Sequence, residues 1–329
     1  MARVSSLEPA AQEFARLAAQ PPILSQLAPA VARKRLDDVQ SGPVAKPEVD
    51  SEWIRVRHLH HDVRVWIARP PGSRGTHLPV VVYLHGGGWV LGSATTHDRL
   101  VRELAVGVQA AFVFVEYERS PEARYPVALH QAYAVAQWIQ EHGAESGLDS
   151  TRMAVAGDSA GGNLAAALTI MAKRVGDISF VHQSLYYPVT DAAQDTDSYR
   201  EFAGGPHLTA DTMAWFWDAY LPDLERRSEA TASPLRAAPE ELAGLPDAFI
   251  LVDEHDVLRD EGEAYASKLT EAGVRCSSVR YNGTLHDFMM LDPVRETAAA
   301  TMATAQAIDV LRQALHSSCR HLAQAGRAS

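Results

Sequence analysis

Continuously apolar runs alternate with longer amphipathic segments through most of this sequence. Apolar and β-branched runs typical of buried strands occur at 79–84, 153–156 and 247–252. A periodicity of helical type covers segments between the runs, at 96–108, 127–142 and 161–174. Strands that alternate with helices in this way predict right-handed βαβ units and a mostly parallel sheet with helices on its faces.

Two regions interrupt the alternation. Amphipathic helices are predicted over 7–20 and 23–37, and a linker follows at 41–47. Further along, a polar, loop-like stretch precedes a short aromatic-rich helix at 210–221. We therefore predict three parts: an N-terminal helical cap segment at 1–45, an α/β core at 46–190 and 236–320, and a cap insert at 191–235.

The segment Gly157–Gly162 reads Gly-Asp-Ser-Ala-Gly-Gly and joins an apolar strand to a helix-forming run. A G-x-S-x-G turn at such a junction strains the backbone and lifts the serine hydroxyl clear of the sheet. The flanking glycines leave room for the neighbouring strand and helix, where side chains would collide. The helix that begins after Ser159 directs its unpaired N–H groups toward whatever reacts there. Ser159 is therefore a candidate nucleophile.

A second glycine-rich motif, His85–Trp89, follows the buried strand predicted at 79–84. Three consecutive glycines leave their backbone N–H groups bare, so these groups can converge on a developing oxyanion. A flexible linker is the other common use of a triple glycine. The strong strand character before the motif and Trp89 after it argue against a linker, and the motif fits a site of acyl transfer.

A serine nucleophile requires a base and an acid that orients the base. With a G-x-S-x-G turn of this kind, the expected chain order is serine, acid, histidine. His286 is the only histidine in the loop after the strand predicted at 276–281, which makes it the candidate base. The acid should follow the preceding strand, and the local sequence leaves three candidates open there: Asp253, Asp256 and Asp260.

Four motifs in this order resemble those of the hormone-sensitive-lipase branch of the α/β-hydrolases, a family of bacterial esterases. They are the glycine loop at His85–Trp89, the serine turn at Gly157–Gly162, an acid segment at Asp256–Gly262 and a histidine loop at Gly283–Phe288. The resemblance extends from about Val80 to the C-terminal helix. It implies an α/β-hydrolase fold, with a mostly parallel eight-stranded sheet flanked by helices and a helical cap.

The resemblance also implies a role for each residue that matches a motif. The implied catalytic residues are Ser159 as nucleophile, His286 as base and Asp256 as orienting acid. The implied oxyanion hole consists of the backbone N–H groups of Gly87, Gly88 and Ala160. We expect His85 to hold the glycine loop through hydrogen bonds and to transfer no proton.

The aromatic residues of the predicted helix at 210–221 allow two interpretations. Packed over Ser159, they would supply an apolar pocket for the acyl or alcohol group, with Trp89, Trp215 and Phe216 as candidate lining residues. Alternatively, they attach the cap to the main domain, which is the commoner role of aromatic residues on a helix. The sequence predicts the pocket without deciding between these roles for any single residue.

Composition limits the class of protein that this sequence can encode. The chain has 329 residues and is 47% hydrophobic, which is enough for a full core. A net charge of -11 argues against nucleic-acid binding, which favours basic surfaces. Cys276 and Cys319 are too few for a disulfide framework, so both are expected to be reduced. With no signal-peptide pattern and no apolar segment of membrane-spanning length, we expect a cytoplasmic protein.

A cluster at His58, His60, His61 and Asp62 has the composition of a metal site but not its arrangement. On a strand, His58 and His60 share one face while His61 points to the other. No further ligands occur at the spacing of a metal site. We therefore predict no metal and no cofactor.

These observations together predict a serine carboxylesterase that acts on small-molecule esters of short to medium acyl chain length. An amide deacylase, such as an acetyl hydrolase or an arylformamidase, would use the same three residues and is the alternative. A non-catalytic ligand receptor on the same fold is disfavoured, because receptors that resemble this branch have lost the histidine and His286 is present. The sequence is compatible with a homodimer.

Overall fold

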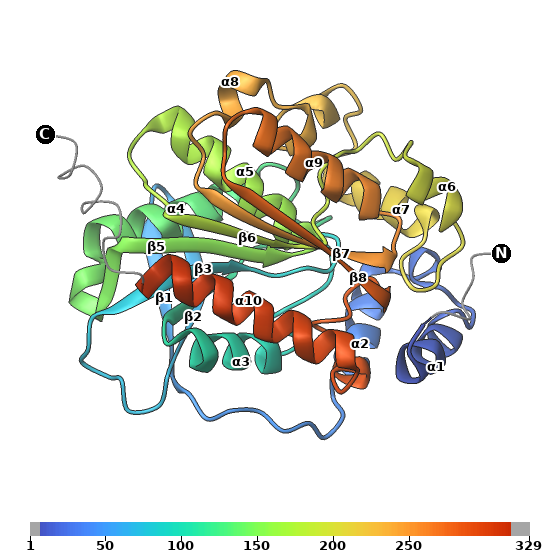
Figure 1. Cartoon of the computed structure of the whole chain (residues 1–329), viewed down its shortest axis with the longest axis horizontal. Coiled ribbons are helices and arrows are strands. Elements are labelled where there is room, and N and C mark those ends of the chain that lie inside the picture. Colours follow the sequence, from blue (N-terminus) through green and yellow to red (C-terminus); the bar gives the residue numbers. More distant parts are fainter. Residues whose placement is uncertain (1–6, 317–329) are drawn as a thin grey trace, which may run out of the picture.

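The computed structural model describes residues 7–316 and places an eight-stranded sheet between two layers of helices (Figure 1). The strands lie in the order β1-β2-β4-β3-β5-β6-β7-β8. Their bounds are β1 Asp50–His58, β2 His61–Arg69, β3 Leu78–Leu84, β4 Ala111–Glu116, β5 Leu148–Asp158, β6 His182–Tyr186, β7 Asp247–His255 and β8 Cys276–Leu285. The predicted eight-stranded α/β fold is confirmed.

Antiparallel pairing is confined to one edge of this sheet, where β2 runs opposite to its two neighbours. Strand β2 is antiparallel to both β1 and β4, whereas every pairing among β4, β3, β5, β6, β7 and β8 is parallel. The β1–β2 hairpin turns at Leu59 and His60, which both have a positive φ, as two-residue hairpins require. The parallel strands end together, so the loops that follow them meet at one edge of the sheet.

Helices cover both faces of this sheet (Figure 1). Helices α3 (Asp98–Val108) and α10 (Ala298–His316) pack together on one face. The other face carries α4 (Val127–His142), α5 (Ala160–Val175) and α9 (Arg259–Glu271), with the short α8 (Pro239–Leu242) beside them. Helix α4 has the bounds predicted from sequence, and α3 and α5 differ from theirs by one or two residues at an end.

Each face of the sheet has its own hydrophobic core. In β3, Val80 and Val82 belong to the core under α4 and α5, while Val81 and Tyr83 belong to the core under α3 and α10. All four side chains are fully buried. Because side chains alternate along a strand, an unbroken apolar run is what two cores require.

The N-terminal helices lie beside the 191–235 segment, beyond the carboxyl ends of the parallel strands (Figure 1). The elements of this region are α1 Pro9–Ala18, the 3-10 turn η2 Leu24–Gln26, α2 Pro29–Val39, α6 Asp197–Glu201 and α7 Ala210–Tyr220. The predicted helix at 23–37 is wrong in its first part, because α2 begins only at Pro29. Proline lacks an N–H group and is tolerated in the first turn of a helix but not in its interior. Turn η2 contacts α7, so the two regions pack directly against each other.

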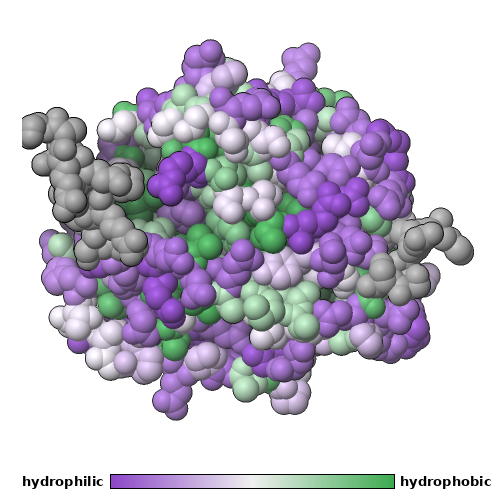
Figure 2. Space-filling model, in the orientation of Figure 1, coloured by the Kyte–Doolittle hydropathy of each residue, from purple (hydrophilic) through white to green (hydrophobic). Residues whose placement is uncertain are grey.

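The surface is largely polar on the face shown in Figure 2, where hydrophobic residues occur in small scattered groups. Charged residues make up 22% of the sequence. Among residues 7–316, no helix combines the length and apolar character needed to cross a membrane. The apolar side chains are concentrated instead in the two cores.

Candidate active site

Ser159 occupies the turn between β5 and α5 in a strained backbone conformation. Its φ of 54° and ψ of -120° lie in a region that non-glycine residues rarely adopt. Glycines on either side make the turn possible, because a Cβ on Gly157 would collide with the Gly161 backbone and a Cβ on Gly161 with that of Leu84. The sharp turn leaves Ser159 on the wall of a cavity at the carboxyl edge of the sheet.

Hydrogen bonds connect the Ser159 hydroxyl to two further side chains. His286 Nε2 lies 2.8 Å from Ser159 Oγ, and His286 Nδ1 lies 2.7 Å from Asp256 Oδ2. All three residues are at least 97% buried. Asp256 follows β7 and His286 follows β8, so the carboxyl ends of parallel strands bring together residues that are far apart in sequence.

The structure distinguishes the three aspartates that the local sequence left open. Asp256 is the one hydrogen-bonded to His286, and its other carboxylate oxygen accepts from the Leu258 N–H at 3.0 Å. Asp253 Oδ2 lies 3.9 Å from His286 Nδ1, too far for a hydrogen bond. Asp260 points elsewhere, because it accepts from the Ser198 N–H at 2.7 Å and pairs with the neighbouring arginine.

Asp253 is a fully buried carboxyl group beside this site. Neither of its oxygens has a hydrogen-bond partner within the described part of the chain. Burial raises the pKa of Asp253 well above its usual value, and the neighbouring Asp256 raises that pKa further. Burial and the neighbouring carboxyl group therefore both favour the neutral form of Asp253, whereas Asp256 is the residue that hydrogen-bonds to His286 Nδ1.

His286 lies between two carboxylates. Besides Asp256, Asp287 Oδ1 lies 3.5 Å from His286 Nε2. Burial by itself lowers the pKa of His286, but the charges of Asp256 and Asp287 outweigh it and raise the pKa to about 10. Asp287 also faces His207 of the 191–235 segment, at 3.8 Å from His207 Nε2. Asp287 and His207 were not predicted as site residues, and the one signal in the sequence is the position of Asp287 directly after His286.

The glycine loop after β3 folds into a tight turn. The N–H groups of Val90 and Leu91 both donate to the Gly87 carbonyl oxygen, at 3.1 and 2.8 Å. Gly87 and Gly88 have φ values of 104° and 60°, which glycine adopts readily. Within residues 7–316, no hydrogen bond uses the N–H group of Gly87, Gly88 or Ala160. Gly87 and Gly88 line the same cavity as Ser159, and the Ala160 N–H lies at the first residue of α5.

His85 lies beneath this loop. Its Nδ1 is 2.8 Å from the Gly86 carbonyl oxygen, and its ring stacks on Tyr117 with centroids 4.1 Å apart. The Tyr117 hydroxyl donates to the His85 carbonyl oxygen at 2.7 Å. Burial lowers the pKa of His85 well below its usual value, so the imidazole is neutral. These contacts hold the loop in place, in the manner expected of His85.

A buried pair of charged groups supports the serine turn from below. Asp158 precedes the serine and is fully buried. One of its oxygens accepts from the Tyr83 hydroxyl at 2.7 Å, and the other lies 3.1 Å from His97 Nε2. Burial alone lowers the pKa of His97, but the charge of Asp158 raises it above the usual value. The Asp158–His97 pair therefore connects the end of β5 to the residue that precedes α3.

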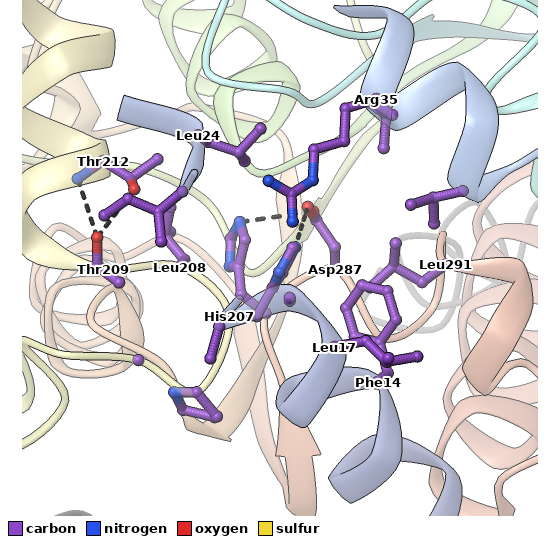
Figure 3. A pocket seen from close by; sticks show the side chains of 18 of the residues that line it. Phe14, Leu17, Leu24, Arg35, His207, Leu208, Thr209, Thr212, Asp287 and Leu291 are labelled. Carbon is purple, nitrogen blue, oxygen red and sulfur yellow. Dashed lines mark hydrogen bonds and ion pairs between the residues drawn. The ribbon is translucent and has the colours of Figure 1, made fainter. Parts of the chain in front are cut away.

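A cavity of about 710 Å³ opens in front of the serine. Ser159, His286 and the glycine loop form one wall, and α1, α2 and parts of 203–216 form the other. Figure 3 shows the apolar side chains that line it, together with the pair between His207 and Asp287. The labelled apolar residues in this view are Phe14, Leu17, Leu24, Leu208 and Leu291.

Of the three residues predicted to line a pocket, only Phe216 lies on the wall of this cavity. Its ring covers Gly88 so closely that a Cβ there would collide with it. Trp89 is buried in the core instead and stacks on Tyr220, with ring centroids 4.2 Å apart. Trp215 packs beside Phe216 without reaching the cavity, because successive residues of a helix point in different directions. The prediction for Trp89 and Trp215 is therefore corrected.

Two groups among residues 7–316 have side chains close enough to suggest a metal site. One consists of Asp253, Asp256 and His286, whose imidazole already bonds to serine and aspartate. The other is formed by His58 with Glu141 and His142, mostly exposed. His60, His61 and Asp62, the other members of the cluster noted in the sequence, belong to neither group.

Comparisons with known proteins agree with this geometry. The family described as alpha/beta hydrolase fold matches residues 81–290. Carboxylesterase NlhH of Mycobacterium tuberculosis is 41% identical over 289 residues, covering 87% of this chain and 89% of NlhH. Esterase LipI of the same species is 38% identical over 297 residues, covering 86% and 88%. The crystal structure of a thermostable esterase from Pseudomonas putida superposes with a TM-score of 0.91 and 44% identity, covering 94% of this chain and 98% of that one.

Proposed function

The chain belongs to the alpha/beta hydrolase family, in its hormone-sensitive-lipase branch, and from this premise we propose that it is a serine carboxylesterase. Its substrates are small esters of short to medium acyl chain length. The observation that carries the proposal is the pair of hydrogen bonds that runs from Ser159 through His286 to Asp256. Relatives named as carboxylesterases and esterases cover most of the chain and support the same conclusion.

In the proposed first step, Ser159 Oγ attacks the ester carbonyl carbon while His286 Nε2 takes the hydroxyl proton. Asp256 keeps the Nδ1 proton in place and stabilises the imidazolium that forms. The carbonyl oxygen becomes an oxyanion, which accepts hydrogen bonds from the unused N–H groups of Gly87, Gly88 and Ala160. Their positions on a rigid loop and a helix N-terminus favour that role.

The tetrahedral intermediate then collapses, and the alcohol leaves with the proton that His286 carries. The acyl group remains on Ser159 Oγ as an ester. A water molecule enters, gives a proton to His286 and attacks the acyl carbon, and the same N–H groups hold the second oxyanion. Release of the carboxylic acid returns the proton to the serine, so the cycle needs no cofactor.

We assign the N-terminal segment 1–45 and the insert 191–235 to a cap, and 46–190 with 236–320 to the core. Support for the division comes from the cavity, which lies between core residues such as Ser159 and residues of both proposed cap segments. Phe216 and Leu208 of the insert, with Phe14 of the N-terminal segment, give the cavity an apolar wall. This wall receives the acyl or alcohol group of the ester.

The proposal includes two statements about the state of the protein. A cytoplasmic location is favoured by the small number of cysteines, of which Cys276 forms no disulfide within residues 7–316 and Cys319 lies outside the described residues. The sequence is compatible with a homodimer, and sedimentation velocity of the purified chain in an analytical ultracentrifuge tests this. Neither statement changes the assignment of the catalytic groups.

The amide deacylase remains the second candidate, because the same three residues would serve it. Turnover of 4-nitrophenyl acetate and 4-nitroacetanilide, which share an acetyl group, distinguishes the two activities. The experiment measures both rates before and after treatment with a phosphonate inhibitor. We expect fast, phosphonate-sensitive hydrolysis of the ester and little of the anilide. Faster turnover of the anilide would show that the protein is an amide deacylase and not an esterase. No turnover of either substrate would favour the non-catalytic ligand receptor.

A further inference from the structure

The cavity in front of the serine contains an arginine that has no acidic partner among the described residues. Arg35 lies on α2 and lines the cavity together with Ser159 and His286. Within residues 7–316, the one hydrogen bond of its guanidinium runs from Nη1 to the backbone carbonyl of Pro22. No ion pair joins Arg35 to a carboxylate in that part of the chain. Figure 3 shows its side chain extending from α2 into the cavity.

Other charged residues on the cavity wall are engaged elsewhere or exposed. Glu13 forms an ion pair with Arg16, and both side chains are more than half exposed. Asp287 lies between His286 and His207, within ion-pair distance of each. Asp211 is an exposed residue in the first turn of α7. Among the cavity residues that the structure describes, Arg35 is thus the cation whose guanidinium retains N–H groups without a hydrogen-bond partner.

The surroundings of Arg35 favour an anionic ligand of a particular kind. Figure 3 shows Phe14, Leu24 and Leu291 on the walls of the same cavity. A substrate that fills this space displaces water, and a charge interaction strengthens when water is removed. A planar guanidinium presents parallel N–H donors that match the two oxygens of a carboxylate.

We propose that Arg35 selects esters that carry a second, ionised carboxylate group at a distance from the ester bond. The inference rests on the proposed esterase function and adds to it the substrate class and the residue that recognises it. The carboxylate belongs either to the acyl part, as in the half-ester of a dicarboxylic acid, or to the alcohol part, as in an acetylated hydroxy acid. In both cases the guanidinium holds the anion while Ser159 reacts with the ester carbonyl.

The test compares anionic and neutral esters of similar length by titrating the acid released. Monoethyl adipate against ethyl hexanoate places the charge on the acyl part, and 4-acetoxybutanoate against butyl acetate places it on the alcohol part. For the unmodified protein, we expect a higher kcat/KM for the anionic member of one pair. The pair that shows this preference identifies the part of the ester that contacts Arg35.

Three variants then connect the preference to this residue. Arg35→Gln should lower kcat/KM for the preferred anionic ester by about tenfold or more, mainly through KM, since it removes a charge-assisted hydrogen bond. Its neutral counterpart should change by less than about twofold. Arg35→Lys keeps the charge and should retain part of the preference. Lys34→Gln is the matched control, because it removes one positive charge from an exposed position on the same helix.

The outcomes separate this inference from the esterase proposal. Hydrolysis of both neutral esters without any preference for an anionic partner overturns the role of Arg35 and leaves the esterase intact. An equal loss on anionic and neutral esters in Arg35→Gln also overturns it, because the residue then orders the cavity and recognises no carboxylate. Failure of the unmodified, correctly folded protein to hydrolyse any of the four esters overturns the esterase proposal itself. Thermal melts of each variant establish that it is folded.

Discussion

His286 Nε2 lies 2.8 Å from Ser159 Oγ, although 127 residues separate the two in the chain. The contact depends on two turns of the chain. A strained turn raises the serine at the end of β5, and a loop after β8 returns the imidazole to the same edge of the sheet. Because both turns follow parallel strands, a rigid sheet fixes the distance between the reacting groups.

The first prediction concerns the nucleophile. Ser159→Ala should reduce ester turnover on the order of a million-fold, the loss seen when a serine protease loses its nucleophile. The melting temperature should stay close to that of the unmodified protein, since alanine keeps the backbone conformation and removes only the hydroxyl. Mass spectrometry should place a phosphonate adduct on the peptide that contains Ser159. An adduct on another serine would contradict the assignment.

The second prediction separates the two aspartates beside His286. Asp256→Asn should lower kcat by about 10⁴-fold, because an amide no longer stabilises the imidazolium or its correct tautomer. Asp253→Asn should be mild, since burial raises the pKa of the Asp253 carboxyl and favours its neutral form, and the group lies 3.9 Å from the imidazole. Steady-state kinetics of both variants provide the measurement. The assignment of the orienting acid fails if Asp253→Asn proves the more damaging of the two.

The third prediction concerns pH. His286 accepts a proton only when it is neutral, and its pKa is raised from the ordinary value to about 10 by the charges of Asp256 and Asp287. The kcat/KM profile should therefore rise with pH and have its midpoint above about 6.5, the value for an unperturbed histidine. Asp287→Asn removes one of the charges, so the midpoint should move to lower pH.

A matched control is available for this pH experiment. Asp309→Asn changes the net charge equally at an exposed position on α10 and should leave the midpoint where it was. A midpoint that shifts equally in both variants would show an effect of net charge alone. Maximal activity near pH 5 in the unmodified protein would contradict the role of His286 as base.

The fourth prediction concerns acyl chain length. A cavity of about 710 Å³ lined by Phe216 should accommodate butanoate or hexanoate esters better than esters with about sixteen acyl carbons. Phe216→Ala removes the ring that lies over Gly88 and should move the optimum toward longer chains. The measurement is kcat/KM for a series of 4-nitrophenyl esters.

Trp215→Ala serves as the comparison for the Phe216 variant. This residue packs beside Phe216 and does not line the cavity, so its loss should lower the melting temperature and leave the chain-length preference unchanged. A changed chain-length preference in this variant would show that Trp215 contributes to the substrate cavity. Efficient hydrolysis of long-chain triglyceride emulsions by the unmodified protein would contradict the esterase assignment and identify the protein as a true lipase.

The fifth prediction concerns the ion pair beneath the serine turn. His97→Ala leaves the Asp158 carboxylate buried without its cation and should destabilise the protein by about 3 kcal/mol. Because the pKa of His97 is raised in the folded state, its contribution is complete below about pH 6.5 and disappears as pH rises through the folded-state pKa. Urea unfolding at pH 6 and at pH 9 measures the difference. A cost that is as large at pH 9 as at pH 6 would contradict a charged His97.

The sequence by itself determined the fold and the position of the strained turn that carries Ser159. Strands that are buried on both faces need uninterrupted apolar runs, and a strained serine turn needs glycines at fixed positions, so both are visible locally. Helix α4 has its predicted bounds because the helical periodicity on which that prediction rests is also a local pattern. The start of α2 at Pro29 could also have been predicted from the sequence. Proline is tolerated in the first turn of a helix but not in its interior, so a helix that contains Pro29 is expected to begin there.

Only the tertiary structure decided which side chains meet at the carboxyl edge of the sheet. Asp253 and Asp256 are three residues apart, and their distances to His286, 3.9 and 2.7 Å, depend on how β7 ends relative to β8. The cavity likewise unites Phe216 with Arg35 and Asp287 from distant segments and excludes Trp215. Such contacts depend on helix orientation and on packing between elements, and these are fixed by the whole core and not by any local pattern.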